Sequence, residues 1–232
     1  MKELWKKLAV VEIFALSMAF IETLIVVYIR MLYYTTGFKF PLNPYIEPWI
    51  YNVEIIREFF TIIMLATVAI LAAKKFTTRF AYFIYAFAVW DISYYIWLKI
   101  ILNWPSSIFT WDILFLIPIP WIGPVITPVI CAIIMATFAP LILNLDSKKK
   151  NVKINPKEWA LLILGSILIL YTWMIDFFKL ILNQGQFTKL LKNPEFQKTV
   201  AEFIPTTYNW PIFTLGITII ITAIIIWFKR VK

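Results

Sequence analysis

Long apolar stretches alternate with short polar segments along the whole chain. A helix needs about 20 apolar residues to cross the hydrocarbon core of a membrane. Stretches of this kind cover residues 8–31, 53–73, 80–102, 157–182 and 209–228. A further apolar region, residues 108–144, is too long for one straight span. The pattern therefore predicts about six membrane spans, one of which is interrupted.

The interrupted region contains prolines at 118, 120, 124, 128 and 140. Proline breaks a helix because it lacks a backbone N–H and its ring clashes with the preceding turn. We predict a half-helix or re-entrant piece at 108–117, a break at 118–120 and the main span at 121–144. Irregular backbone at membrane depth must be buried in protein or face water. We therefore expect the function to lie around this segment.

A polar segment, residues 183–208, separates the last two predicted spans. Phe187, Leu190 and Leu191 lie at helical spacing within it. The spacing predicts a short amphipathic helix on the membrane surface, outside the cytoplasm.

The composition supports a membrane protein. Hydrophobic residues make up 62% of the 232-residue chain and charged residues only 15%. A soluble domain of this length could not bury so much apolar surface. We predict an all-α fold, in which residues 1–232 form one polytopic transmembrane helical bundle.

Two residue types restrict the chemistry. The chain has no histidine and a single cysteine, Cys131. This excludes the usual haem and zinc ligands, an intramolecular disulfide and the commonest general base. The few glycines are scattered, so no phosphate-binding loop is present. We predict no cofactor and no metal site, and any acid–base chemistry would use Asp, Glu, Lys or Tyr.

Basic residues gather at alternate ends of the predicted spans. The positive-inside rule assigns such ends to the cytoplasm. The clusters are Lys2, Lys6 and Lys7; Lys74, Lys75 and Arg79; Lys148, Lys149, Lys150, Lys153 and Lys157; and Lys229, Arg230 and Lys232. We predict a multi-pass protein of the inner (plasma) membrane with both termini in the cytoplasm. The net charge of +9 then reflects topology and contact with anionic lipid, and we predict no nucleic-acid partner.

Ionisable residues are concentrated toward the outer ends of the spans. A charge that faces lipid costs roughly 2.5–3.5 kcal/mol, so these groups should face one another inside the bundle. The acidic ones are Glu22, Glu54, Glu58, Asp91, Asp112 and Asp176, and the basic ones are Arg30, Arg57, Lys99 and Lys179. The excess of carboxyl groups predicts that some are protonated, or that a cation or cationic ligand is held among them.

We predict a single pocket in the outer half of the bundle. Arg57 is the expected fixed cation, because arginine stays charged when buried. Asp91 is the expected titrating group, because it lies deepest and beside aromatic side chains. The residues around the pocket are Glu22, Arg57, Glu58, Asp91, Lys99 and Asp112, with Trp90, Tyr94, Trp111 and Trp121 as walls. They are candidates for ligand binding or proton coupling, and none is assigned as catalytic. A purely structural ion-pair network is the alternative explanation.

Three groups of motifs fall within about the first 130 residues. They are Glu-x5-Tyr-x-Arg at 22–30, Arg57-Glu58, and a run over 90–124 with Trp-Asp, Tyr-Tyr, a second Trp-Asp and Pro-x-Pro-Trp-x-Gly-Pro. Together they resemble a family of uncharacterised prokaryotic integral membrane proteins. The resemblance supports the choice of residues and implies no activity.

Three functions from different classes follow. The first is a transporter, channel or binding protein for a small molecule or ion, which uses Asp91 and Glu22 to couple to a proton or cation. The second is an intramembrane enzyme that binds a lipid or isoprenoid and uses carboxyl acids beside aromatic rings. The third is an accessory subunit of a membrane complex. We favour the first, and the sequence leaves the oligomeric state open.

Overall fold

The computed structural model describes residues 2–34, 37–43, 45–183 and 203–232. Six helices within these ranges are long and apolar enough to span a membrane. They are α1 (Lys2–Tyr33), α2 (Pro48–Ala72), α3 (Phe76–Leu102), α4 (Ile126–Ser147), α5 (Pro156–Asn183) and α7 (Trp210–Val231). The prediction of a helical membrane bundle with six spans is confirmed, and the chain is an integral membrane protein.

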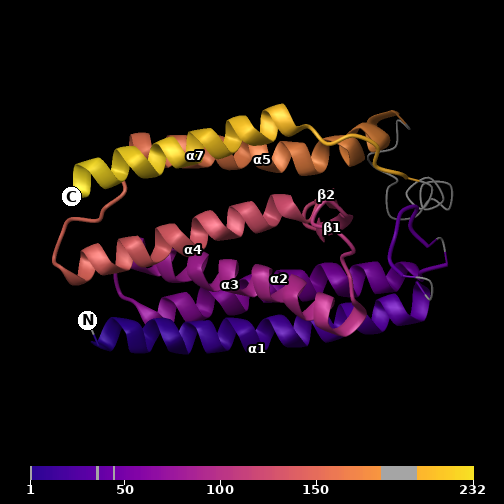
Figure 1. Ribbon diagram of the computed structural model, residues 1–232, viewed down its shortest axis with the longest axis horizontal. Coiled ribbons are helices and arrows are strands. Elements are labelled where there is room, and N and C mark those ends of the chain that lie inside the picture. The colour runs from indigo at the N-terminus through magenta and orange to yellow at the C-terminus, as the bar shows by residue number, and fades with distance from the viewer. Residues whose placement is uncertain (1, 35–36, 44, 184–202) are drawn as a thin grey trace.

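Consecutive spans run in opposite directions, so both ends of the chain lie at the same end of the bundle (Figure 1). Helix α3 is central, because it packs against α1, α2 and α4. Helices α5 and α7 pack mainly against each other and lie along the α4 side (Figure 1). We call the end that carries the two termini the terminal end, and the opposite end the remote end.

A β-hairpin lies between α3 and α4, toward the remote end (Figure 1). Its strands, β1 (Trp111–Phe115) and β2 (Trp121–Pro124), pair antiparallel with an irregularity between Ile113 and Phe115. The predicted non-helical backbone at 118–120 is confirmed, since these residues connect the two strands. Of the two alternatives predicted for 108–117, the half-helix is wrong, because Trp111–Phe115 form a strand. The following span begins at Ile126 rather than at 121.

The hairpin has a physical reason in the sequence. Strand β1 is rich in aromatic and β-branched residues, which favour extended backbone. Pro118 and Pro120 lie in the connection, where no ladder hydrogen bond depends on their missing N–H groups. Further backbone bonds, from Val125 to Thr110 and from Ile126 to Ile108, continue the pairing into α4. The strand pairing and these bonds satisfy backbone groups of the hairpin within the protein, as a membrane interior requires.

The predicted amphipathic segment falls mostly outside the described residues. Of the segment 183–208, residues 184–202 are not described, and residues 203–208 form neither helix nor strand.

Small residues allow close helix packing. Ala15 and Ala19 of α1, Ala81 and Ala86 of α3, and Ala139 of α4 are fully buried in the main core. Gly165 of α5 lies directly against Gly216 of α7; a Cβ atom on Gly165 would approach the Gly216 carbonyl oxygen to 2.7 Å. In lipid, no hydrophobic driving force holds helices together, so close packing at small residues stabilises their contacts instead.

Candidate functional site

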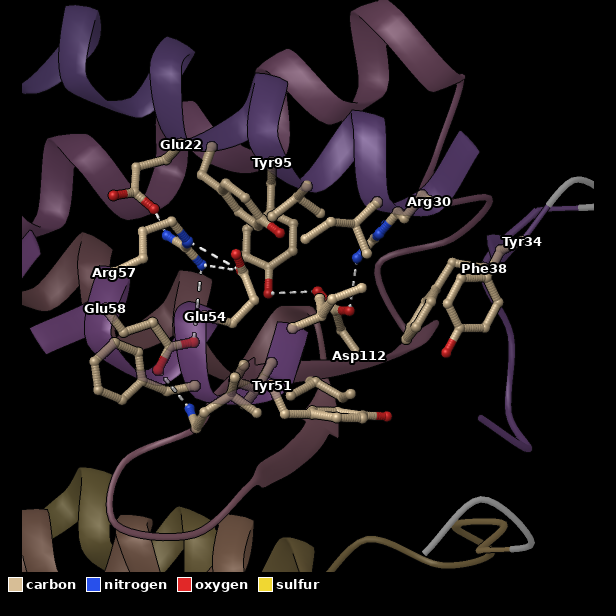
Figure 2. Close-up of a pocket in the computed structure, with 18 of the residues that line it drawn as sticks. Glu22, Arg30, Tyr34, Phe38, Tyr51, Glu54, Arg57, Glu58, Tyr95 and Asp112 are labelled. Atoms are coloured by element: carbon tan, nitrogen blue, oxygen red, sulfur yellow. Dashed lines mark hydrogen bonds and ion pairs between the residues drawn. The ribbon is translucent and has the colours of Figure 1, made fainter. Parts of the chain in front are cut away.

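A cavity of about 130 Å³ lies between α1, α2, α3 and the hairpin (Figure 2). We call it the pocket. Its lining residues on these helices belong to the halves that lie toward the remote end. Its charged lining residues are Glu22, Arg30, Glu54, Arg57, Glu58, Asp91 and Asp112, and its aromatic ones are Tyr34, Phe38, Tyr51, Trp90, Tyr94, Tyr95 and Phe115. The rest of the lining is aliphatic.

Helical spacing explains how three helices supply this lining. On α1, Glu22, Val26 and Arg30 follow one another at intervals of four residues, so they form one face. On α2, Glu54 and Glu58 are also four residues apart. The same holds on α3 for Asp91 and Tyr95, with Tyr94 beside them. Each helix therefore presents one polar or aromatic stripe to the pocket and apolar faces elsewhere.

Arg57 is the centre of an ion-pair cluster at one end of the pocket (Figure 2). Its guanidinium group pairs with Glu22 of α1 and, at 2.8 Å, with Glu54 of its own helix. Glu58 lies 4.0 Å away and accepts a hydrogen bond of 2.7 Å from the Leu116 backbone N–H of the hairpin connection. Thr61 donates a hydrogen bond to Glu22. The cluster thus joins α1, α2 and the hairpin connection.

A second cluster surrounds Asp112, which is fully buried on β1. Arg30 Nη2 donates to one carboxylate oxygen at 2.9 Å, and the Tyr95 hydroxyl donates to the other at 3.3 Å (Figure 2). The Arg30 guanidinium carbon also lies 4.3 Å from the ring centre of Phe38 and 3.9 Å from that of Trp104. These aromatic faces stabilise the buried cation, and the ion pair ties the hairpin to α1.

Asp91 lies on the α3 face that lines the pocket and is partly buried. Among the described residues, no side chain or backbone group forms a hydrogen bond or ion pair with its carboxyl group. It is the only one of the acidic lining residues without such a partner among the described residues. A carboxylate in this position is costly unless it binds a proton or a cation.

The charges of the pocket do not balance. Five carboxyl groups line it, from Glu22, Glu54, Glu58, Asp91 and Asp112. Of the described residues, two cationic side chains line it with them, those of Arg30 and Arg57. Asp112 is matched by Arg30, and three glutamates share Arg57. Asp91 has no cationic partner among the residues that the structure describes. The pocket therefore favours added positive charge, either protons or a cationic ligand.

The aromatic side chains that line the pocket are uncharged. The Tyr94 and Tyr95 ring centres lie 5.2 Å apart in an edge-to-face arrangement. Burial raises the pKa of Tyr34, which lies beyond the end of α1, so its phenol stays neutral. Neutral aromatic rings beside carboxyl groups form an environment that suits organic cations.

Six of the nine predicted site residues line the pocket. They are Glu22, Arg57, Glu58, Asp91, Tyr94 and Asp112, and the expected wall residue Trp90 is with them. That these residues bind a ligand or carry protons stays a prediction.

The remaining three, Lys99, Trp111 and Trp121, lie outside the pocket. Lys99 is exposed, and its Nζ donates to the carbonyl groups of Asn103 and Pro105, so it satisfies backbone at the end of α3. Trp111 precedes Asp112 on a strand, where neighbouring side chains point to opposite faces. It packs edge-on against Tyr208, with ring centres 6.1 Å apart.

Trp121 pairs with Phe115 in the hairpin and packs outside the pocket. It stacks on Trp173 of α5 with ring centres 5.5 Å apart. The Trp173 indole N–H in turn donates to Thr127 at 2.9 Å. These tryptophans join the hairpin to α5, and they serve packing rather than the pocket.

Sequence reasoning left several lining residues out of the predicted site. Arg30 and Glu54 were recognised as membrane charges but not placed in the pocket. The interval of eight residues between Glu22 and Arg30 puts both on one face of α1 and could have included Arg30. Tyr34 follows the last residue of α1, so no helical pattern marks it. Tyr51 lies on α2 three residues before Glu54, a spacing that puts both on one face and could have included Tyr51.

Within the described ranges, no three acidic or cysteine side chains lie close enough together to hold a metal ion. Comparisons with models of known protein families, with curated proteins and with solved structures find no match to this chain.

Proposed function

We propose that this integral membrane protein binds a small cation in the pocket and exchanges it for a proton, as a proton-coupled transporter or binding protein would. The observation that carries the proposal is the charge imbalance: five carboxyl groups and two guanidinium groups share one cavity inside a six-span bundle. Buried charge of one sign is costly, so positive charge has to accompany it.

Asp91 is the group that we propose to exchange proton for cation. Each of the other carboxyl groups of the pocket pairs with an arginine or accepts a hydrogen bond from a hydroxyl or a backbone N–H group. Asp91 has no such partner among the described residues, so its charge state depends on what enters the pocket. A proton and a cation then compete for one carboxylate, which is the simplest basis for coupling.

The lining suggests the route of entry. Phe38 and Ile46 line the pocket, and both lie between α1 and α2, beyond the ends of the spans. We propose that the pocket opens toward water at the remote end. The basic clusters flank the terminal end, which supports cytoplasmic termini and a pocket that faces the outside of the plasma membrane. Membership of the family that the motifs resemble remains a proposal and adds no activity.

Proteoliposomes with a pH-sensitive dye inside test this function. A cation gradient across vesicles that contain the wild-type protein should drive proton movement in the opposite direction. Asp91→Asn should abolish the signal, whereas Asp176→Asn should keep it, because Asp176 pairs with Lys179 on the surface of α5. Equal proton movement in wild-type and Asp91→Asn vesicles, or none with any cation, would contradict the proposal.

An intramembrane enzyme is the second candidate, and one observation favours it. The pocket combines carboxyl acids with aromatic faces, which are the groups that generate and stabilise a carbocation. Conversion of a lipid or isoprenoid by the purified protein, lost in Asp91→Asn, would support this candidate in place of transport.

A further inference from the structure

We propose that the ligand of the pocket is a small organic ammonium ion rather than a metal ion. This inference rests on the proposed function, because it names the class of cation that the pocket takes. Three features of the lining carry it: the size of the cavity, the arrangement of aromatic rings around Asp91, and the way in which arginine already engages the other carboxyl groups.

The cavity has the size of a small organic molecule. Its volume is about 130 Å³. An apolar protein cavity of about 150 Å³ holds a benzene molecule, so the pocket has room for a group of about that size. A bare metal ion would leave most of this space unfilled.

Aromatic rings line the pocket together with Asp91, whose carboxyl group has no partner in the described part of the chain. Tyr94 and Tyr95 follow Asp91 on α3 by three and four residues, which places these three side chains on one side of the helix, and Trp90 lines the same pocket. A carboxylate next to aromatic faces gives an ammonium group both an ion-pair partner and π-electron density within about 6 Å. The aliphatic and aromatic remainder of the lining suits the organic part of such a ligand.

A metal ion would find too few ligands. Hard cations such as Ca²⁺ take about six to eight oxygen ligands. In the part of the chain that the structure describes, no three acidic side chains converge closely enough to supply even half of such a set. Arg57 engages Glu22 and Glu54, and Arg30 engages Asp112. An ammonium ion requires only the carboxylate of Asp91 and the rings beside it.

Thermal unfolding of the purified protein in neutral detergent tests the ligand class. Benzylammonium and benzyl alcohol have the same size and shape and differ in charge. At equal concentration and constant ionic strength, benzylammonium should raise the unfolding temperature clearly more than benzyl alcohol. Sodium, potassium and magnesium should give no comparable shift, and tetramethylammonium should give a shift similar to that of benzylammonium.

Two pocket variants and one control locate the effect. Asp91→Asn should lose the benzylammonium shift, and Tyr94→Leu should weaken binding about threefold or more through loss of a cation–π contact. The matched control Asp176→Asn should bind like the wild type. Because Tyr94→Leu keeps all charges, it tests the inference even where Asp91→Asn unfolds.

Each other outcome overturns the inference in a distinct way. Stabilisation by metal cations but not by ammonium ions would reject the ligand class and leave proton-coupled cation binding intact. Equal effects of benzylammonium and benzyl alcohol would show that the pocket recognises apolar volume alone. If no cation of any kind stabilised the protein, the ligand class and the proposed function would fail together.

Discussion

At the scale of single residues, arginine determines which carboxyl groups of the pocket are satisfied. Arg57 has only 17% of its side chain exposed and contacts carboxyl groups from two helices. Arg30 has 7% exposed and holds Asp112, which comes from a strand far away in the sequence. In the proposed function, Asp91 is the remaining group, whose charge a ligand sets.

Replacement of Arg57 should damage the fold. In Arg57→Ala, the buried Glu22 and Glu54 lose their cationic partner. This loss should lower the free energy of unfolding by about 3–5 kcal/mol. Chemical unfolding in detergent measures the change. The control Lys179→Ala, which removes an exposed surface pair, should change it by less than about 1 kcal/mol. Equal effects of the two substitutions would show that the Arg57 cluster does not stabilise the bundle.

Arg30 and Asp112 should be energetically coupled. Either single substitution leaves a buried charge without its partner, whereas the double variant Arg30→Leu/Asp112→Leu removes both charges. A double-mutant cycle should therefore give a coupling energy of about 1–3 kcal/mol from unfolding measurements. Additive effects of the two single substitutions would mean that the ion pair does not hold the hairpin to α1.

The sequence predicted the depth of these residues in the membrane better than the direction in which their side chains point. Depth along a helix follows from residue position, so Glu22, Glu58 and Asp91 could be assigned to one slab of the membrane. Which way a residue on an irregular segment points cannot be obtained in that way. Trp111 and Asp112 are neighbours, yet only Asp112 faces the pocket, because the segment is a strand and not a helix.

At the scale of elements, two features distinguish this fold from a simple helical bundle: the hairpin between α3 and α4, and the close pairing of α5 with α7. The prolines predicted that the helix would break, but proline does not specify what replaces the helix. The strands form because Trp111–Phe115 and Trp121–Pro124 can pair with each other, and this depends on a register that no local pattern shows.

The contact between α5 and α7 should be sensitive to one methyl group. A Cβ atom at Gly165 would lie 2.6 Å from Ile220 Cγ1 and 2.7 Å from the Gly216 carbonyl oxygen. Gly165→Ala should therefore push the helices apart and lower the free energy of unfolding by about 1–3 kcal/mol. Thermal unfolding in detergent provides the comparison with Ser166→Ala, an exposed neighbour that should have little effect. A stable Gly165→Ala variant would indicate that the helices tolerate a wider separation.

At the scale of the whole molecule, the distribution of charge matches the arrangement of the spans. The basic clusters lie at or near the terminal end (Figure 1). The residues of α1, α2 and α3 that line the pocket belong to the remote halves of these helices. Ion pairs at the terminal end, Lys75–Asp146 at 2.8 Å and Arg230–Glu158 at 2.7 Å, join consecutive parts of the bundle there. Hydrophobic length predicted all six spans, because that signal is local and strong.

The proposed orientation makes a direct prediction. Reporter fusions after Lys75 and Ser147 should report the cytoplasm, and a fusion after Asn183 should report the outside, because basic residues are retained on the cytoplasmic side. Activity of paired reporters in whole cells measures each location. An external signal after Ser147 would invert the orientation and place the pocket on the cytoplasmic side.

Release of protons on ligand binding tests the central claim most directly. Purified protein in weakly buffered detergent solution, at a pH where Asp91 is protonated, is mixed with benzylammonium while a pH indicator records the solution. The wild type should release about one proton per bound cation, because the two compete for one carboxylate. Asp91→Asn should release none. Binding without proton release, or equal release from Asp91→Asn, would contradict the exchange of a proton for a cation in this pocket.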